Sequence, residues 1–117
     1  MIVLKGEIMM FEAHEHKKAK RIVGDTEIET QTVELTSANI LEIEVGTNGY
    51  CGGDTGHGSR TYFRLKDLAS TDMEIKIITG DYGDDGVEII LGGDTELSTF
   101  IGALEFAAKV LKEQSKE

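Results

Sequence analysis

The stretch DTELSTFIGALEFAAKVLK, residues 94–112, decides the fold because its apolar residues recur at the spacing of an amphipathic helix. One face of the predicted helix carries the most regular series: Leu97, Ile101, Leu104, Ala108 and Leu111. Asp94 or Thr95 can cap the N-terminus of this helix, and Glu96 suits its first turn. A long C-terminal helix is therefore the first element that the sequence predicts.

A second group of residues widens the apolar face of this helix: Phe100, Ala103, Ala107 and Val110. Such a broad face predicts burial against a sheet, or against a sheet and a partner chain together. Residues 40–45 supply the clearest strand, because Leu41, Ile43 and Val45 alternate with two glutamates. We expect one face of that strand to be buried and the glutamate face to be in water.

Other segments before the helix are patterned as further strands. Residues 61–65 and 73–77 also alternate, and residues 87–91 are more continuously apolar, as a central strand would be. The glycine- and aspartate-rich residues 80–86 between the last two predict a hairpin turn. Residues 28–35 predict a largely exposed strand.

The N-terminal part of the chain is less clearly patterned. Residues 2–11 suit an extended segment that Gly6 interrupts as at a bulge, and residues 12–21 suit a short helix or a loop. We therefore expect a single α+β domain over residues 1–117. Its sheet should be antiparallel or mixed, with about five to six strands and the C-terminal helix on one face.

The composition narrows the class of partner. The net charge is −10, from 22 acidic and 12 basic residues, and such a chain is unlike a general nucleic-acid binder. No apolar run reaches the roughly 20 residues of a membrane helix, and residues 1–6 do not read as a signal peptide. With Cys51 as its single cysteine, the chain is expected in the reducing cytoplasm.

Residues 46–62, GTNGYCGGDTGHGSRTY, differ from the rest of the chain. They join two strands that a loop of two to five residues could join, and long glycine-rich loops are usually functional or disordered. Glycines let backbone N–H groups converge on an anion. Arg60 offers a planar fork that matches phosphate or carboxylate, and Tyr50 or Tyr62 could stack on a base.

This composition fits a phosphorylated small molecule better than a polymer. The expected ligand-binding residues are Asn48, Tyr50, Gly53, Asp54, Thr55, Gly56, His57, Gly58, Ser59, Arg60 and Tyr62. The stretch is neither a Walker loop nor a dinucleotide-binding fingerprint, because it lacks Gly-Lys-Ser/Thr and a strand follows it. A flexible or tightly wound loop without a ligand remains the structural alternative.

Residues 53–62, GDTGHGSRTY, together with residues 65–72, LKDLASTD, resemble small uncharacterised proteins of Gram-positive phages and mobile elements. The likeness runs from about residue 35 to the C-terminal helix. It implies a phage or prophage setting and assigns no catalytic residue. Small phage proteins of that kind include sponges for nucleotide immune signals, and we extend this role to the chain as an expectation. The leading hypothesis is a non-catalytic binder that works as a homo-oligomer.

Two other classes of function stay open. In a small hydrolase, His57 and Asp54 would act as a base and its orienting group on such a ligand, with Ser59 or Cys51 as nucleophile. Residues 54–56, Asp-Thr-Gly, also match the central triplet of aspartic proteases, although glycines replace the apolar residues expected before the aspartate. In an interaction or inhibitor module, the acidic surface would bind a host protein.

No metal or other cofactor is expected. His14 and His16 could be metal ligands together with His57, but no His and Cys spacing supports zinc, and a surface histidine pair is the simpler interpretation. Asp81 and Asp85 fall at calcium-loop positions, but Gly92 stands where the bidentate glutamate should be.

Overall fold

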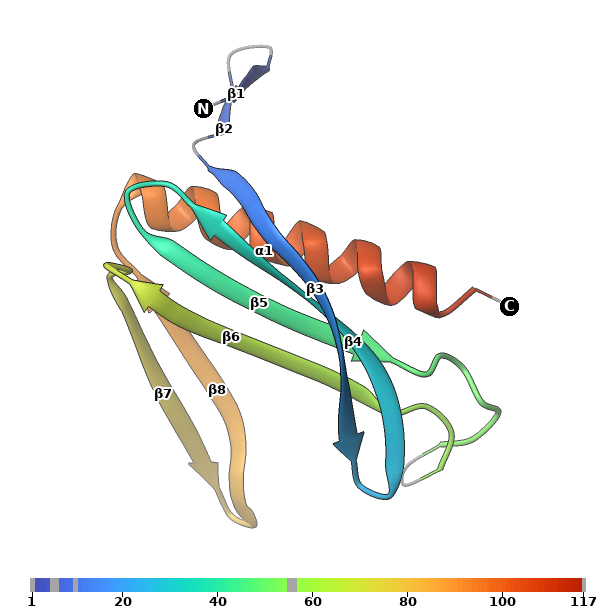
Figure 1. Cartoon of the computed structure of the whole chain (residues 1–117). Coiled ribbons are helices and arrows are strands. Elements are labelled where there is room, and N and C mark those ends of the chain that lie inside the picture. The colour runs from blue at the N-terminus through green and yellow to red at the C-terminus, as the bar shows by residue number, and fades with distance from the viewer. Residues whose placement is uncertain (1, 5–6, 10, 55–56, 117) are drawn as a thin grey trace.

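The computed structural model describes residues 2–4, 7–9, 11–54 and 57–116 (Figure 1). Within these residues, one helix follows eight strands. In chain order the elements are β1 (Ile2–Leu4), β2 (Glu7–Met9), β3 (Glu12–Val23), β4 (Thr26–Thr36), β5 (Ile40–Thr47), β6 (Thr61–Ala69), β7 (Met73–Gly80), β8 (Gly83–Leu91) and α1 (Asp94–Gln114). The predicted α+β class, with a long C-terminal helix on an antiparallel sheet, is confirmed.

The sheet that carries the helix has the order β3-β4-β5-β6, and every neighbouring pair is antiparallel. Strands β7 and β8 pair only with each other among the described residues, and so do β1 and β2. The extended segment expected over residues 2–11 therefore contains two short paired strands. Gly6, the expected bulge, lies outside the described residues.

The core lies between α1 and the strands β4 and β5 (Figure 1). Its buried members are Val33, Leu35, Leu41, Ile43, Val45, Ala103, Ala107 and Val110. The alternation of β5 places three fully buried side chains on the helix side. Burial of each such large apolar side chain stabilises the fold by about 1.5–3 kcal/mol. The buried face predicted for residues 40–45 is confirmed.

The helix lies where the sequence predicts it, and only part of the broad apolar face expected for it is buried. Leu97, Ile101 and Leu104 are exposed, whereas Ala103, Ala107 and Val110 contact the sheet. Small residues let a helix lie close to a twisted sheet, and the partly buried Phe100, Phe106 and Leu111 also pack against this core. The N-cap is Gly93, without a side-chain cap, so the capping role expected for Asp94 or Thr95 is wrong.

Two predictions for the first half of the chain are also wrong. Residues 12–21, expected as a short helix or a loop, belong to the 12-residue strand β3. Their polar composition suits this strand because β3 lies at the edge of its sheet. Strand β4, expected to be largely exposed, is internal, and Ile28, Val33 and Leu35 are buried.

The turn predicted within residues 80–86 is confirmed, since Gly80 pairs with Gly83 across the end of the β7–β8 hairpin. The expectation that residues 87–91 form a central strand is wrong. The hairpin extends away from the four-stranded sheet (Figure 1), and the side chains of Ile75, Ile77 and Val87 are 51% to 59% exposed.

The four-stranded sheet is strongly curled. Its two edge strands, β3 and β6, contact each other although β4 and β5 lie between them in the pairing order. Arg21 of β3 lies over the ring of Tyr62 of β6, with its guanidinium carbon 5.1 Å from the ring centroid. Gly46 permits this curvature, because a Cβ there would meet the backbone of Glu29 and Thr30. The face opposite α1 is therefore concave.

Candidate functional site

The glycine-rich loop between β5 and β6 is closed at its base by hydrogen bonds. The amide of Asn48 donates to the carbonyl of Arg60 at 3.3 Å, and the amide of Arg60 donates to Oδ1 of Asn48 at 2.7 Å. Thr47 joins this base, because its hydroxyl donates to the Arg60 carbonyl and accepts from the amide of Gly49. The two ends of the loop are therefore held together where they leave β5 and β6.

The outer part of the loop also folds back on itself. The amide of His57 donates to the carbonyl of Asp54 at 2.7 Å. Gly58 has φ of 76° and packs against Gly53, so a Cβ at Gly58 would approach the Gly53 carbonyl carbon to 2.9 Å. Glycine is needed at both positions for this contact. The described part of the loop is thus tightly wound. A tightly wound loop that binds no ligand is one of the structural alternatives named for this stretch.

Backbone amides in this loop already have acceptors. Those of Asn48, Gly49, His57 and Arg60 donate to oxygen atoms of Thr47 or of the loop itself. A ligand bound by a convergent group of these amides would have to replace such bonds. Thr55 and Gly56, two of the predicted ligand-binding residues, lie outside the described residues.

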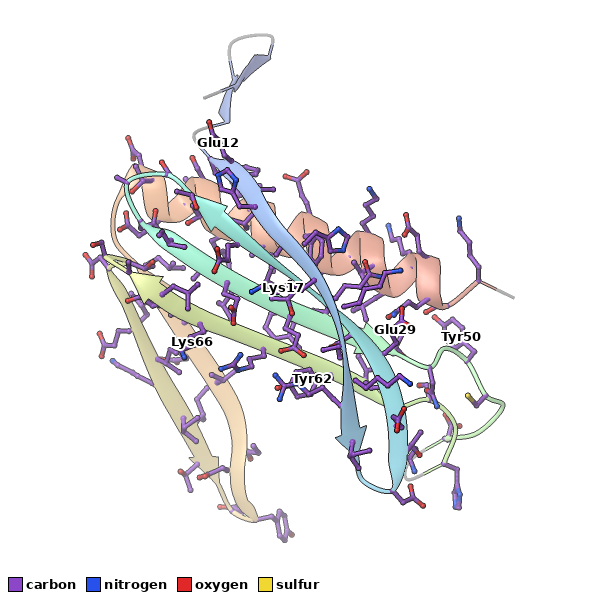
Figure 2. The ribbon with its side chains drawn as sticks, viewed as in Figure 1. Glu12, Lys17, Glu29, Tyr50, Tyr62 and Lys66 are labelled. Carbon is purple, nitrogen blue, oxygen red and sulfur yellow. The ribbon has the colours of Figure 1, made fainter. Side chains whose placement is uncertain are left out.

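The loop places its two predicted stacking residues in different surroundings (Figure 2). Tyr50 is exposed beside the C-terminal end of α1, where it lines hollows of about 360 and 200 Å³ with Leu111 and Ser115. Tyr62 lies instead on the concave face of the sheet, beneath Arg21. The sequence-predicted site is therefore divided between two regions.

Arg60 belongs to the second of these regions, the one that contains Tyr62. Its Nη1 donates to the carbonyl oxygens of Gly58 and Ser59 at 3.2 and 3.3 Å. Its Nε lies near the β3–β4 turn, 3.8 Å from where a Cβ on Gly24 would be. These two carbonyl bonds orient the guanidinium of Arg60.

Asp54, His57 and Cys51 are exposed on the loop. The hydrogen bond between Asp54 and His57 joins backbone atoms, so it does not position the imidazole against the carboxylate. The Cys51 thiol donates to the carbonyl of Gly49 at 3.2 Å. These contacts do not assemble a nucleophile, a base and an orienting group.

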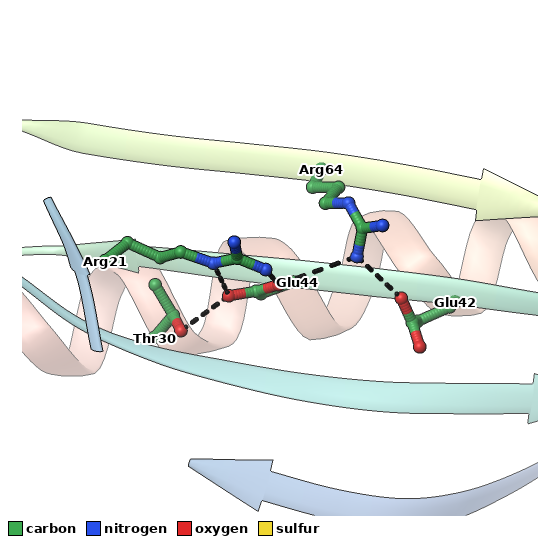
Figure 3. Close-up of polar contacts among 5 residues, drawn as sticks. All are labelled: Arg21, Thr30, Glu42, Glu44 and Arg64. Carbon is green, nitrogen blue, oxygen red and sulfur yellow. Dashed lines mark hydrogen bonds and ion pairs between the residues drawn. The ribbon is translucent and has the colours of Figure 1, made fainter. Parts of the chain in front are cut away.

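Sequence reasoning missed the ionic network on the concave face (Figure 3). Arg21 donates from Nε and Nη2 to the two oxygens of Glu44, at 2.7 and 2.6 Å. Thr30 donates to the same carboxylate at 2.7 Å. Arg64 donates to Glu42 at 3.1 Å, and its Nη1 lies 3.9 Å from Glu44. Two arginines from opposite edges of the sheet thus meet above glutamates of β5.

Glu44 is buried, with 4% of its side chain exposed. The expectation that the glutamate face of β5 lies in water is therefore wrong for Glu44. The hydrogen bond from Arg21 is the main reason why the pKa of Glu44 lies below its usual value, and burial opposes this shift. The same hydrogen bond raises the pKa of Arg21 above its usual value. Glu44 is thus a buried, ionised acceptor that fixes one guanidinium.

The histidines of β3 have separate partners. His14 lies 3.1 Å from a carboxylate oxygen of Glu12, while His16 lies 2.7 Å from Gln31 and packs edge-on against Phe106. A hollow of about 510 Å³ lies between this part of β3 and the C-terminal half of α1. Across the described ranges, no cluster of three or more His, Cys, Asp or Glu residues is arranged to hold a metal ion.

The chain matches no protein-family model, and neither a curated protein nor a solved structure is significantly similar to it. In the described part of the chain, no helix has both the length and the apolar character needed to cross a membrane.

Proposed function

We propose that this protein binds and sequesters a small, nucleotide-like anion without turning it over, and that it does so as a homo-oligomer in the cytoplasm. The observation that supports the proposal is the position of Arg60 and Tyr62 at one end of the concave face. A guanidinium can bind a phosphate through paired hydrogen bonds, and a tyrosine ring can stack on a base, which for Tyr62 must use the ring face opposite Arg21. A phage or mobile element as the source, with the protein as a counter-defence sponge, is part of this proposal.

The contacts of Asp54 and His57 favour binding over hydrolysis. Their hydrogen bond joins backbone atoms and shapes the loop tip, so it does not pair the His57 imidazole with the Asp54 carboxylate. An anion that enters at Arg60 would meet a cation already oriented by two carbonyl groups. Preorganisation of this kind lowers the entropy that binding would otherwise cost.

The direct test is isothermal titration calorimetry of the purified protein against a panel of nucleotides. We expect one or more nucleotides to bind, and Arg60→Gln to weaken that binding about tenfold or more, as for loss of a charge-assisted hydrogen bond. Lys76→Gln, which removes one positive charge from the β7–β8 hairpin, is the matched control. Equal affinities of the wild type and Arg60→Gln would contradict the proposed role of Arg60.

Recovery of the bound nucleotide separates sequestration from hydrolysis. After incubation and denaturation of the complex, chromatography should return the ligand intact. A product that forms with the wild type and not with His57→Ala would instead establish the hydrolase alternative.

A further inference from the structure

The concave face carries cations at both edges of the sheet. The register places Lys17, Thr32, Glu44 and Arg64 in one row across the four strands. The next row contains Ala19, Thr30, Gly46 and Tyr62. Small residues therefore lie beside Tyr62 in its row, and cationic residues lie on the two edge strands, β3 and β6. The cations of this face thus lie on the edge strands, and the carboxylates of Glu42 and Glu44 lie between them on β5.

The two arginines of this face keep donors for a ligand. Arg21 uses Nε and Nη2 for Glu44, and Arg64 uses Nη1 for its glutamates. Among the described residues, Nη1 of Arg21 and Nε and Nη2 of Arg64 have no hydrogen bond. The two side chains are 40% and 38% exposed, so both remain accessible to solvent.

Buried Glu44 gives this arrangement a rigidity that exposed arginines usually lack. Its carboxylate is satisfied by Arg21 and Thr30, and the Arg21 guanidinium also lies over Tyr62. A long side chain fixed in this way loses little further freedom when it binds an anion. The bonds to Glu44 and the contact with Tyr62 thus prepare the exposed edge of Arg21 for a ligand.

We propose that Arg21 and Arg64 bind a phosphate group of the ligand on the concave face, so that the ligand carries more than one phosphate. This inference rests on the proposed function, in which Arg60 binds one anionic group. Residues four apart in an extended chain lie roughly 13 Å apart at their backbones, which leaves room for Arg60 and Arg64 to bind separate phosphate groups of one ligand. An oligophosphate can extend past Tyr62 toward the second arginine pair.

A purely structural role for the arginines makes a different prediction. If the network only joins the edges of the sheet, loss of Arg64 changes stability and leaves anion binding unaltered. If the arginines contact phosphate, loss of Arg64 weakens binding and reduces its dependence on salt, because one ionic contact has gone. Arg64 suits the test because it makes one hydrogen bond, to Glu42, whereas Arg21 makes two to buried Glu44.

The test uses inorganic tripolyphosphate and the full chain, with NMR observation of arginine Nε–H groups. We expect saturable shifts of the Arg21 and Arg64 signals, and a loss of affinity of about tenfold or more in Arg64→Gln. Lys76→Gln should bind as the wild type does. Circular dichroism and thermal melting establish that each variant is folded, and Arg21→Lys provides a second, milder substitution.

Two results would overturn the inference: shifts absent from both arginines at millimolar tripolyphosphate, or an affinity that Arg64→Gln and Arg21→Lys leave unchanged. Nucleotide binding that depends on Arg60 alone would refute this inference and leave the proposed function intact. Tripolyphosphate binding that depends on Arg64, with every nucleotide of the panel inactive, would refute the proposed function and support an oligophosphate site.

Discussion

At the scale of single residues, Glu44 shows how its surroundings determine the role of a charge. The sequence marks it as the polar partner of an alternating strand, which predicts a solvent-exposed carboxylate. The structure covers it with Arg21 and Thr30, so that it joins edge strand β3 to the interior of the sheet. No local pattern reveals this contact, because it depends on the curl of β3 toward β6.

The acid sensitivity of the fold should reflect Glu44. Its folded pKa is lowered, so its stabilising contribution is complete above the unfolded pKa of about 4.3 and is lost as pH falls through the folded value. At neutral pH, Glu44→Gln should lower the free energy of unfolding by about 1–3 kcal/mol. Urea denaturation at several pH values should show this difference shrinking below about pH 4.

Glu88→Gln is the control for this experiment, because Glu88 is exposed on β8. Its stability should follow that of the wild type at each pH. A wild-type advantage over Glu44→Gln that persists undiminished in acid would show that Glu44 does not contribute through its ionised form.

At the scale of elements, local patterns predicted where most strands and the helix lie, but not how they face one another. The position of α1 follows from the helical spacing over residues 94–112, and β5 follows from alternation. Both patterns are properties of a short segment. Which part of the broad apolar face of α1 is buried is not such a property: Ala103 and Ala107 contact the sheet, whereas Leu97 and Leu104 are exposed. That choice is made by the shape of the sheet, which residues far away in the sequence determine.

Neighbouring alanines in α1 provide a sensitive test of which face is buried. Ala107 is 5% exposed in the core and Ala108 is exposed. Ala107→Leu should lower the free energy of unfolding by about 1–3 kcal/mol, because extra methylene groups do not fit a packed core. Ala108→Leu should change it by less than about 0.5 kcal/mol.

Chemical denaturation measures the free energy of unfolding of both variants. Helix propensity hardly affects the difference between them, because both variants carry the same substitution at neighbouring positions. A larger cost at Ala108 would mean that the face with Leu97, Ile101 and Leu104 is the buried one after all.

At the scale of the whole molecule, the curled sheet divides what the sequence presents as one site. Tyr50 in the β5–β6 loop and Tyr62 at the start of β6 are 12 positions apart, yet they face α1 and the concave sheet respectively. The sequence singled out the stretch 46–62, to which Arg60 and Tyr62 belong. It could not predict Arg21 and Arg64 as companions, because the pairing of β3 with β4 and of β5 with β6 is needed to place them together.

The exposed apolar surfaces provide support for the proposed homo-oligomer. Ile75, Ile77 and Val87 lie on one face of the β7–β8 hairpin, since Ile77 pairs with Val87 and Ile75 with Ile89. An isolated two-stranded hairpin is at best marginally stable in water, and extended apolar patches commonly mark interaction sites. A second copy of the chain would cover this face through the same residues on both sides, as in a two-fold symmetric contact.

Sedimentation velocity of Ile77→Ser tests that contact. The wild type should sediment as a species larger than the 12.8 kDa chain, and Ile77→Ser should shift it toward the monomer, because a hydroxyl replaces an apolar group of the interface. Lys76→Ser alters the adjacent residue on the opposite face of the hairpin and should leave the assembly unchanged. A wild type that is monomeric at every concentration, or an Ile77→Ser assembly as stable as that of the wild type, would exclude the hairpin face as the interface. In that case the helix face with Leu97, Ile101 and Leu104 would be the next surface to substitute.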